Sequence, residues 1–140
     1  MDTGPIIDHL KGQLAGFRKV GGAADLAAIG GGAPPAPAAY VLPATELPGD
    51  SEVATTTIQR VVAVFSVVLA VSNKSNAEGE AAVRDLEPRR DQVKAALLGW
   101  APGTGLGPIS FAGGRLVSFD DAVLFWMDDF KTYYYLRSTQ

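Results

Sequence analysis

One apolar segment constrains the fold more than any other part of the chain. Residues 59–71 (QRVVAVFSVVLAV) are rich in valine and contain no proline, no glycine and no charge after Arg60. The apolar run is too short to cross a bilayer as a helix, and β-branched residues favour a pleated strand. We therefore predict that this segment is the central strand of a sheet.

The strand period divides this segment into two apolar faces, both of which need cover. The bulkier face consists of Val61, Ala63, Phe65, Val67, Leu69 and Val71. The smaller face consists of Val62, Val64, Ser66, Val68 and Ala70. We expect a long helix over residues 77–100 to cover one face. The other must be covered by the first helix, over residues 6–17, or by a neighbouring subunit.

Length and composition limit the classes of protein to consider. A chain of 140 residues, 47% apolar and 19% charged, is expected to fold as one domain spanning residues 1–140. Its net charge of −3 gives no general attraction for nucleic acid or for an anionic membrane. The absence of cysteine excludes disulfides and thiolate metal sites. The first ten residues lack an apolar run, so we expect no export, no membrane anchor and a cytoplasmic product.

Periodicity and turn residues predict the remaining elements. Pro5 in a first turn and apolar residues three and four apart predict a helix that ends near Gly16. Residues 38–46 read as a strand in which Pro43 requires an edge or a bulge. The main helix must kink or break at Pro88. The other expected segments are a helical turn at 23–28, a mobile connection at 30–37, a polar hairpin loop at 47–57, a bend at 113–114, a short strand at 115–119, a tight connection at 120–121 and a long strand at 122–137.

These elements predict an α/β fold of the α+β type. The expected architecture is a twisted, mostly antiparallel sheet of about four to five strands, with one long helix and one or two short helices packed on it. The strands at 38–46 and 59–71 should form a hairpin with a long polar tip, which we expect to contact a partner.

Candidate catalytic and ligand-binding residues do not combine into a site. His9 is the only histidine and has neither cysteine nor a second histidine to work with, so we interpret it as an ordinary helix residue. Neighbouring carboxylates such as Asp128 and Asp129 point to opposite faces of a strand and cannot share a proton or a metal. Asp128 lies between aromatic residues on its face, where it needs an arginine or a backbone amide, within the chain or across a subunit boundary.

Three further patterns have ordinary structural interpretations. Gly103, Gly105 and Gly107 loosely resemble a phosphate loop, but they follow a helix and lack the lysine of such loops. The pair at 89–90 (RR) lies among acids and indicates a solvated helix face. The tyrosines at 133–135 could stack on bases, but few basic residues surround them, which favours a core or interface role. We predict no cofactor, no metal and no catalysis.

Several segments, in their order along the chain, resemble the tail terminator proteins of long-tailed bacteriophages and related prophages. They are residues 4–7 (GPII), 20–26 (VGGAADL), 37–43 (PAAYVLP), the valine strand, 97–102 (LLGWAP) and 124–130 (LFWMDDF) with Thr132 and Arg137. The resemblance spans nearly the whole chain, although each motif alone is short and mostly apolar. Other neck or tail-completion proteins, and tail-tube relatives, could share it.

The resemblance implies a structural virion protein rather than an enzyme. Members of that family are compact α/β subunits that form a hexameric ring on the finished tail tube, stop its polymerisation and present a surface for head attachment. The implied partners are a homohexamer, the tail tube protein and a head completion or connector protein. DNA is expected to pass through the ring without specific recognition, and the implied location is the head-proximal end of the virion tail. A small ligand-binding domain or enzyme is the competing class.

The polar hairpin tip and the aromatic last strand supply the residues that we predict to contact other subunits or the tube. They are Glu46, Asp50, Glu52, Thr55, Thr57, Trp126, Asp128, Tyr133, Tyr135 and Arg137.

Overall fold

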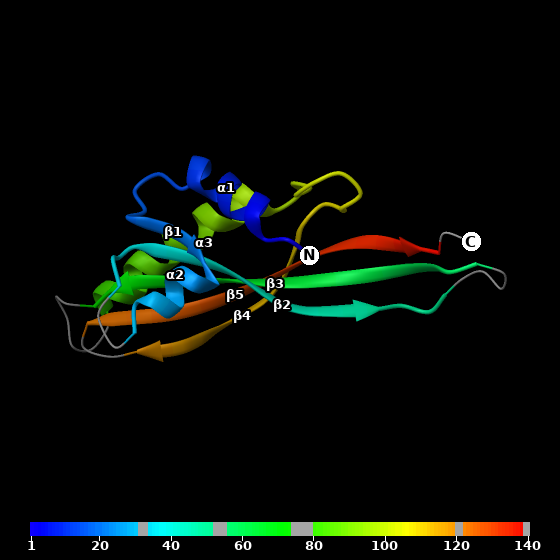
Figure 1. The fold of residues 1–140 in the computed structure, drawn as a ribbon. Coiled ribbons are helices and arrows are strands. Elements are labelled where there is room, and N and C mark those ends of the chain that lie inside the picture. Colours follow the sequence, from blue (N-terminus) through cyan, green and yellow to red (C-terminus); the bar gives the residue numbers. More distant parts are fainter. Residues whose placement is uncertain (31–33, 52–55, 74–79, 120–121, 139–140) are drawn as a thin grey trace.

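The computed structural model describes residues 1–30, 34–51, 56–73, 80–119 and 122–138. Figure 1 shows a sheet with helices on both of its faces. The elements in chain order are α1 (Gly4–Gln13), β1 (Lys19–Gly22), α2 (Ala23–Ala28), β2 (Ala38–Pro48), β3 (Ile58–Ser72), α3 (Glu80–Leu97), β4 (Ser110–Phe119) and β5 (Val123–Arg137).

The five strands form one sheet in the order β1-β2-β3-β5-β4. Only the β1–β2 pair is parallel, and the other three pairs are antiparallel. The valine strand β3 is therefore central, as predicted, and it pairs with β2 and β5 along most of its length. The predicted α+β fold with a mostly antiparallel sheet and one long helix is confirmed.

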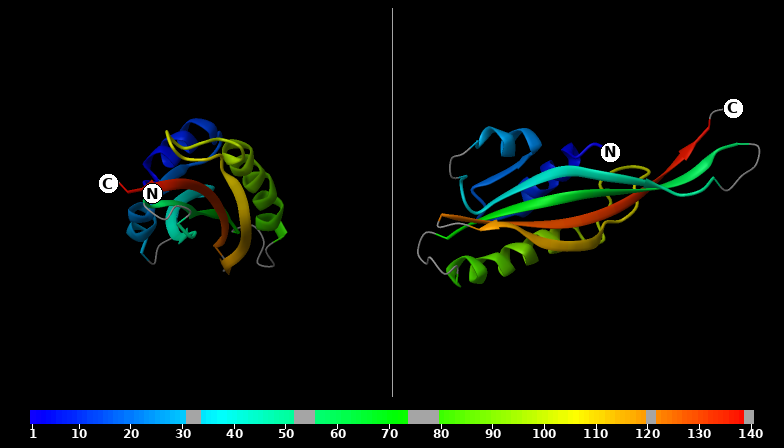
Figure 2. Two further views of the ribbon diagram at one scale, coloured as in Figure 1. Left: turned by 90° about the vertical axis from the view of Figure 1, so that its right-hand side faces the viewer. Right: turned by 90° about the horizontal axis from the view of Figure 1, so that it is seen from below.

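The bulkier face of β3 lies in the main core. Phe65, Val67 and Leu69 are fully buried there, and both α1 and α3 pack against this face through Ile6, Leu10, Leu86 and Val93. Of the two alternatives predicted for the opposite face, cover by the first helix is therefore wrong. The apolar sides of α1 and α3 share one face of the sheet, which is curved and strongly twisted (Figure 2).

The smaller face of β3 is covered at one end by the short helix α2. Leu26 and Ile29 pack against a second cluster that includes Tyr40, Val68 and Ala70. Val62 and Val64, toward the other end of the strand, remain partly exposed. One end of this face is thus closed by the chain itself, while the other end stays accessible.

The strand β2 carries the predicted irregularity at its proline. Its register against β3 shifts between Pro43 and Thr45, and β1 pairs with β2 only as far as Val41. Pro43, which has no N–H to donate, therefore lies both at a bulge and on a free edge. β2 also runs two residues beyond the predicted strand, and its first four residues pair with β1, a strand that we did not predict.

Two further expectations need correction. Of the kink or break expected at Pro88, the break is excluded, because α3 continues as one helix through this residue. The predicted bend and short strand near residues 113–119 form one strand, β4, which is irregular at two points along its pairing with β5. Gly113 has a φ of +117° at one of these irregularities, a conformation that glycine adopts without strain. The expected connection at 120–121 and residues 31–33 of the expected mobile tract lie outside the described residues.

Candidate interaction site on the sheet arm

Strands β2, β3 and β5 continue past the helices as a three-stranded extension (Figures 1 and 2). We call residues 46–51, 56–62 and 133–138 the arm. Within it Pro48 pairs with Val61, and Ile58 pairs with Arg137. Three large apolar side chains of the arm are about half exposed: Leu47 (55%), Tyr135 (46%) and Leu136 (48%). Leu47 and Tyr135 lie on one face of the arm and Leu136 on the other, so both faces of an extension without helix cover expose apolar side chains. Such exposure is typical of an interaction surface.

Glu46 ties the base of the arm to the N-terminus. Its Oε1 accepts hydrogen bonds from the N-terminal ammonium of Met1 at 3.1 Å and from the Tyr134 hydroxyl at 3.0 Å. The bond from the ammonium group, followed by that from Tyr134, lowers the pKa of the Glu46 carboxyl. The same carboxylate raises the pKa of Tyr134. Glu46, a predicted contact residue, thus has partners within the chain.

The outer end of the arm is held by backbone and side-chain hydrogen bonds. The Gly49 N–H donates to the Arg60 carbonyl at 2.7 Å, and Gln59 Nε2 donates to the Gly49 carbonyl at 2.7 Å. The Thr57 carbonyl accepts from the Ser138 N–H at 2.8 Å. Asp50 and Thr57 are exposed at this end. Glu52 and Thr55, also predicted contacts, lie outside the described residues.

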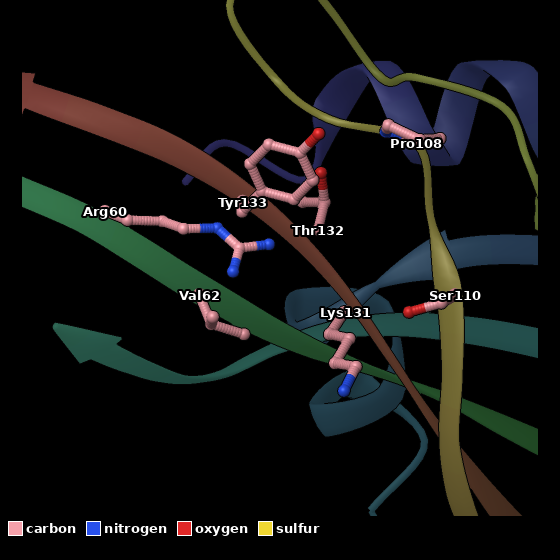
Figure 3. A pocket seen from close by; sticks show the side chains of 7 residues that line it. All are labelled: Arg60, Val62, Pro108, Ser110, Lys131, Thr132 and Tyr133. Carbon is pink, nitrogen blue, oxygen red and sulfur yellow. The ribbon is translucent and has the colours of Figure 1, made fainter. Parts of the chain in front are cut away.

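A pocket of about 170 Å³ lies beside the base of the arm (Figure 3). Two cationic side chains line it, Arg60 from β3 and Lys131 from β5. The Arg60 guanidinium carbon lies 4.3 Å from the centroid of the Tyr133 ring. The other lining residues are Val62, Pro108, Ser110, Thr132 and Tyr133.

The wall of this pocket is fixed by the loop before β4. The Gly107 N–H donates to the Tyr133 carbonyl at 2.8 Å, and the Thr132 hydroxyl donates to the Gly107 carbonyl. A Cβ atom at position 107 would overlap the Tyr133 ring. Gly107 is therefore required for close packing against a tyrosine and does not form part of a phosphate loop.

Asp128 is fully buried, and its partner is an arginine of the same chain. Arg90 donates from Nε to Oδ2 at 3.0 Å and from Nη2 to Oδ1 at 2.9 Å. Trp126 Nε1 adds a third hydrogen bond at 2.8 Å, and the guanidinium group lies 4.6 Å from the Trp126 ring centroid. The predicted arginine partner is confirmed. Since its carboxylate is satisfied internally, Asp128 offers no surface to a second subunit.

Our interpretation of Arg90 as a solvated helix residue is wrong. Its side chain is only 13% exposed, because α3 packs on the sheet with this position facing β5. The hydrogen bonds from Asp128 raise the pKa of Arg90. A Cβ atom at Gly114 of β4 would overlap Asp128 Oδ1, so the glycine leaves room for this buried ion pair.

The other predicted contact residues divide into two groups. Trp126 is partly buried against the main core, under Arg90. Tyr133, Tyr135 and Arg137 lie on the arm, where the two tyrosine rings meet edge to face at 6.3 Å. The structure thus brings the last strand's outer residues together with Asp50 and Thr57, and it separates them from Trp126 and Asp128.

Residue-by-residue reasoning missed Arg60 and Lys131 as a pair. They lie on the same face of different strands, and only the register that pairs Arg60 with Tyr135 and Val64 with Lys131 brings them to one pocket. The alternation of β5 was visible in the sequence, but its alignment with β3 was not. Leu47 was missed because it was assigned to a loop, whereas it belongs to β2.

In the described part of the chain, the single histidine has a packing role. No three side chains of His, Asp or Glu gather there in a group able to hold a metal ion. His9 stacks on Trp100 at a centroid distance of 3.8 Å and hydrogen-bonds the Ala96 carbonyl, which holds α1 against the end of α3. Within the described parts of the chain, no helix is both long and apolar enough to span a membrane.

A sheet arm with exposed apolar side chains is suited to contacts with other molecules. The family described as phage tail terminator protein matches residues 1–140, the whole chain. The chain therefore belongs to the phage tail terminator family and has a structural role in the phage tail. A search of curated proteins found no match.

Proposed function

We propose that this protein caps the completed tail tube as a ring, stops tail polymerisation and provides the surface to which the head is joined. The family match over residues 1–140 is the observation that carries this proposal. It points to a structural protein and not to an enzyme.

The arm supports a role in contacts between molecules. Its exposed Leu47, Tyr135 and Leu136 lie where no helix covers the sheet. Full burial of an exposed leucine contributes about 1.5–3 kcal/mol, so enclosing the exposed half of Leu47 or Leu136 contributes roughly half of that. A subunit that keeps such residues at its surface gains their stabilisation only on assembly.

The β4 edge of the sheet supports the same role. β4 pairs only with β5 in the sheet, and it exposes Leu116 (53%), Val117 (50%) and Phe119 (43%). An outermost strand with apolar side chains is a template for pairing with another chain. The arm and the β4 edge are different surfaces, and contacts between two different surfaces can close into a ring.

The proposed partners follow from this role. A homohexamer forms the ring, its tube-facing side contacts the tail tube protein, and its other side contacts the head completion or connector protein. DNA passes through the ring without specific recognition, in agreement with the net charge of −3. The protein is assembled in the host cytoplasm and remains at the head-proximal end of the virion tail.

Deletion of the gene in its phage, with complementation from a plasmid, tests the proposal. Electron microscopy of the lysate should show overlong or headless tails, and the plasmid should restore virions with tails of normal length. Normal-length tails joined to heads in the deletion strain would contradict the proposal. Headless tails of normal length would assign the protein to another neck or tail-completion role.

A further inference from the structure

Two cations line the pocket beside the arm, and among the described residues neither forms an ion pair. Arg60 stacks on Tyr133, and neither Arg60 nor Lys131 lies within ion-pair distance of a carboxylate among the residues that the structure describes. Ser110 adds a hydroxyl to the same wall. Figure 3 shows these side chains along the pocket on three strands, with the Arg60 guanidinium beside the Tyr133 ring and the Lys131 side chain running away from it.

Two other cations that contact this sheet are paired with carboxylates within the chain. On the same face, Arg115 lies 3.3 Å from Asp129, and behind the sheet Arg90 lies 2.9 Å from Asp128. Two positive groups that line a small pocket repel each other unless an anion lies between them. The arrangement is therefore suited to a single oxyanion group.

We propose that this pocket binds a side-chain carboxylate from a second copy of this chain, with Asp50 at the end of the arm as the acid. The inference rests on the proposed ring and specifies one of its contacts. Arg60 and Lys131 form the charged bonds to the carboxylate oxygens, and the Ser110 hydroxyl donates a further hydrogen bond.

The pocket fits a protein carboxylate better than a DNA phosphate. Val62, Pro108 and the Tyr133 ring supply apolar walls, which suit the Cβ of an acidic side chain and the apolar residues beside it. A chain with a net charge of −3 also lacks the broad positive surface that tracks a nucleic-acid backbone.

Asp50 is the described acid that best fits this contact. It is exposed and lies one residue beyond the Gly49–Arg60 hydrogen bond, at the outer end of the arm. Glu46, the other described acid of the arm, is already bound by the N-terminus and Tyr134. The arm end of one copy and the pocket of the next are different surfaces, so the contact is head-to-tail and compatible with ring closure.

Because the chain has no cysteine, single introduced cysteines report this contact directly. Ser51→Cys lies beside Asp50 and Ser110→Cys lies in the pocket wall, and neither change removes a charge. The two purified single variants are mixed at high concentration and oxidised, and the cross-linked dimer is quantified on a denaturing gel. Ser118→Cys, an exposed serine elsewhere on β4, replaces Ser110→Cys in the matched control.

We expect the Ser51→Cys and Ser110→Cys mixture to give several times more heterodimer than the control. Adding Lys131→Glu to the pocket variant should reduce the yield to the control level, and adding Asp50→Lys to its partner should restore it. A yield equal to the control, or one that charge reversal does not change, overturns the proposal.

The same variants also test whether the pocket binds a DNA phosphate instead of a carboxylate. If the cross-link is absent and Lys131→Glu weakens binding of a fluorescent DNA duplex in anisotropy measurements, the pocket is a phosphate site and the carboxylate proposal is wrong. A negative result for the pocket contact can also be distinguished from a negative result for the proposed tail-terminating function. Overlong tails in the gene deletion would still support tail termination, whereas their absence would remove the proposed function itself.

Discussion

The two halves of β5 differ in burial, although they belong to one continuous strand. In residues 123–130, Leu124 and Phe130 are buried under the helices, and the one buried charge, Asp128, is bound by Arg90 and Trp126. In residues 131–137, Tyr135 and Leu136 are about half exposed. Lys131 lines an open pocket in that second half.

The comparison shows how one sheet serves both folding and assembly. Where α1 and α3 lie over the strand, every polar group requires a partner inside the subunit, since an unpaired buried charge is very costly. Beyond the helices, β5 exposes apolar and charged side chains that can contact other molecules. Changes in the first half should therefore affect stability, and changes in the second half should affect assembly.

Arg90→Ala should produce the largest loss of stability. It leaves the Asp128 carboxylate buried without its guanidinium partner, and breaking a buried ion pair costs about 3–5 kcal/mol. Urea denaturation followed by circular dichroism measures the free energy of unfolding. Arg137→Ala, on the exposed arm, is the matched control and should change it by less than about 0.5 kcal/mol. Equal losses in the two variants would contradict the proposed difference between the halves of β5.

Gly114→Ala should produce an intermediate loss. The added Cβ overlaps Asp128 Oδ1 and disturbs the buried ion pair, and such overpacking costs about 1–3 kcal/mol. The control is Gly12→Ala in α1, where a Cβ meets nothing within 4 Å and where alanine favours the helix. We expect a lower melting temperature for the first variant and an equal or higher one for the second. A stable Gly114→Ala variant would mean that the ion pair tolerates displacement.

Leu47→Ser and Leu136→Ser should affect stability little. Surface substitutions of this kind stay within about 0.5 kcal/mol, because these side chains are already about half exposed in the subunit. Val83→Ser on α3 is matched to Leu47→Ser, since both side chains are 55% exposed. Urea denaturation should place all three variants close to the wild type. A large destabilisation by the arm variants alone would show that the arm belongs to the folding core.

Glu46→Gln should produce the smallest effect, visible only as a change in pH dependence. The folded state lowers the pKa of Glu46, so its stabilising contribution is present above the ordinary carboxyl pKa of about 4.3 and is lost as the pH falls through the lower folded value. Wild type should thus lose stability more steeply than Glu46→Gln over this acidic range in urea denaturation. Parallel pH profiles would exclude a contribution from this contact.

The sequence was sufficient to predict the elements whose signals are local. The valine density of β3, the proline at the start of α1 and the bulge at Pro43 were all correctly inferred, because each depends on residue type and period. The buried arginine partner of Asp128 followed from the cost of an unpaired carboxylate. Its identity as Arg90 did not follow, because it depends on how α3 is rotated on the sheet.

What could not be predicted depends on contacts between distant segments. β1 is only four residues long and contains two glycines, so its strand conformation comes from pairing with β2. The placement of α1 beside α3 and of α2 on the opposite face is likewise a result of packing. The pocket of Arg60 and Lys131 requires the β3–β5 register, which no single stretch of sequence contains.

Tail length in phage that carry arm variants tests the central claim most directly. The Leu47→Ser and Leu136→Ser double variant, which should fold normally, is placed in the phage gene, with Val83→Ser as the control. Electron microscopy of the lysates should show overlong or headless tails for the double variant and normal virions for the control. Tails of normal length joined to heads in the double variant would contradict the account.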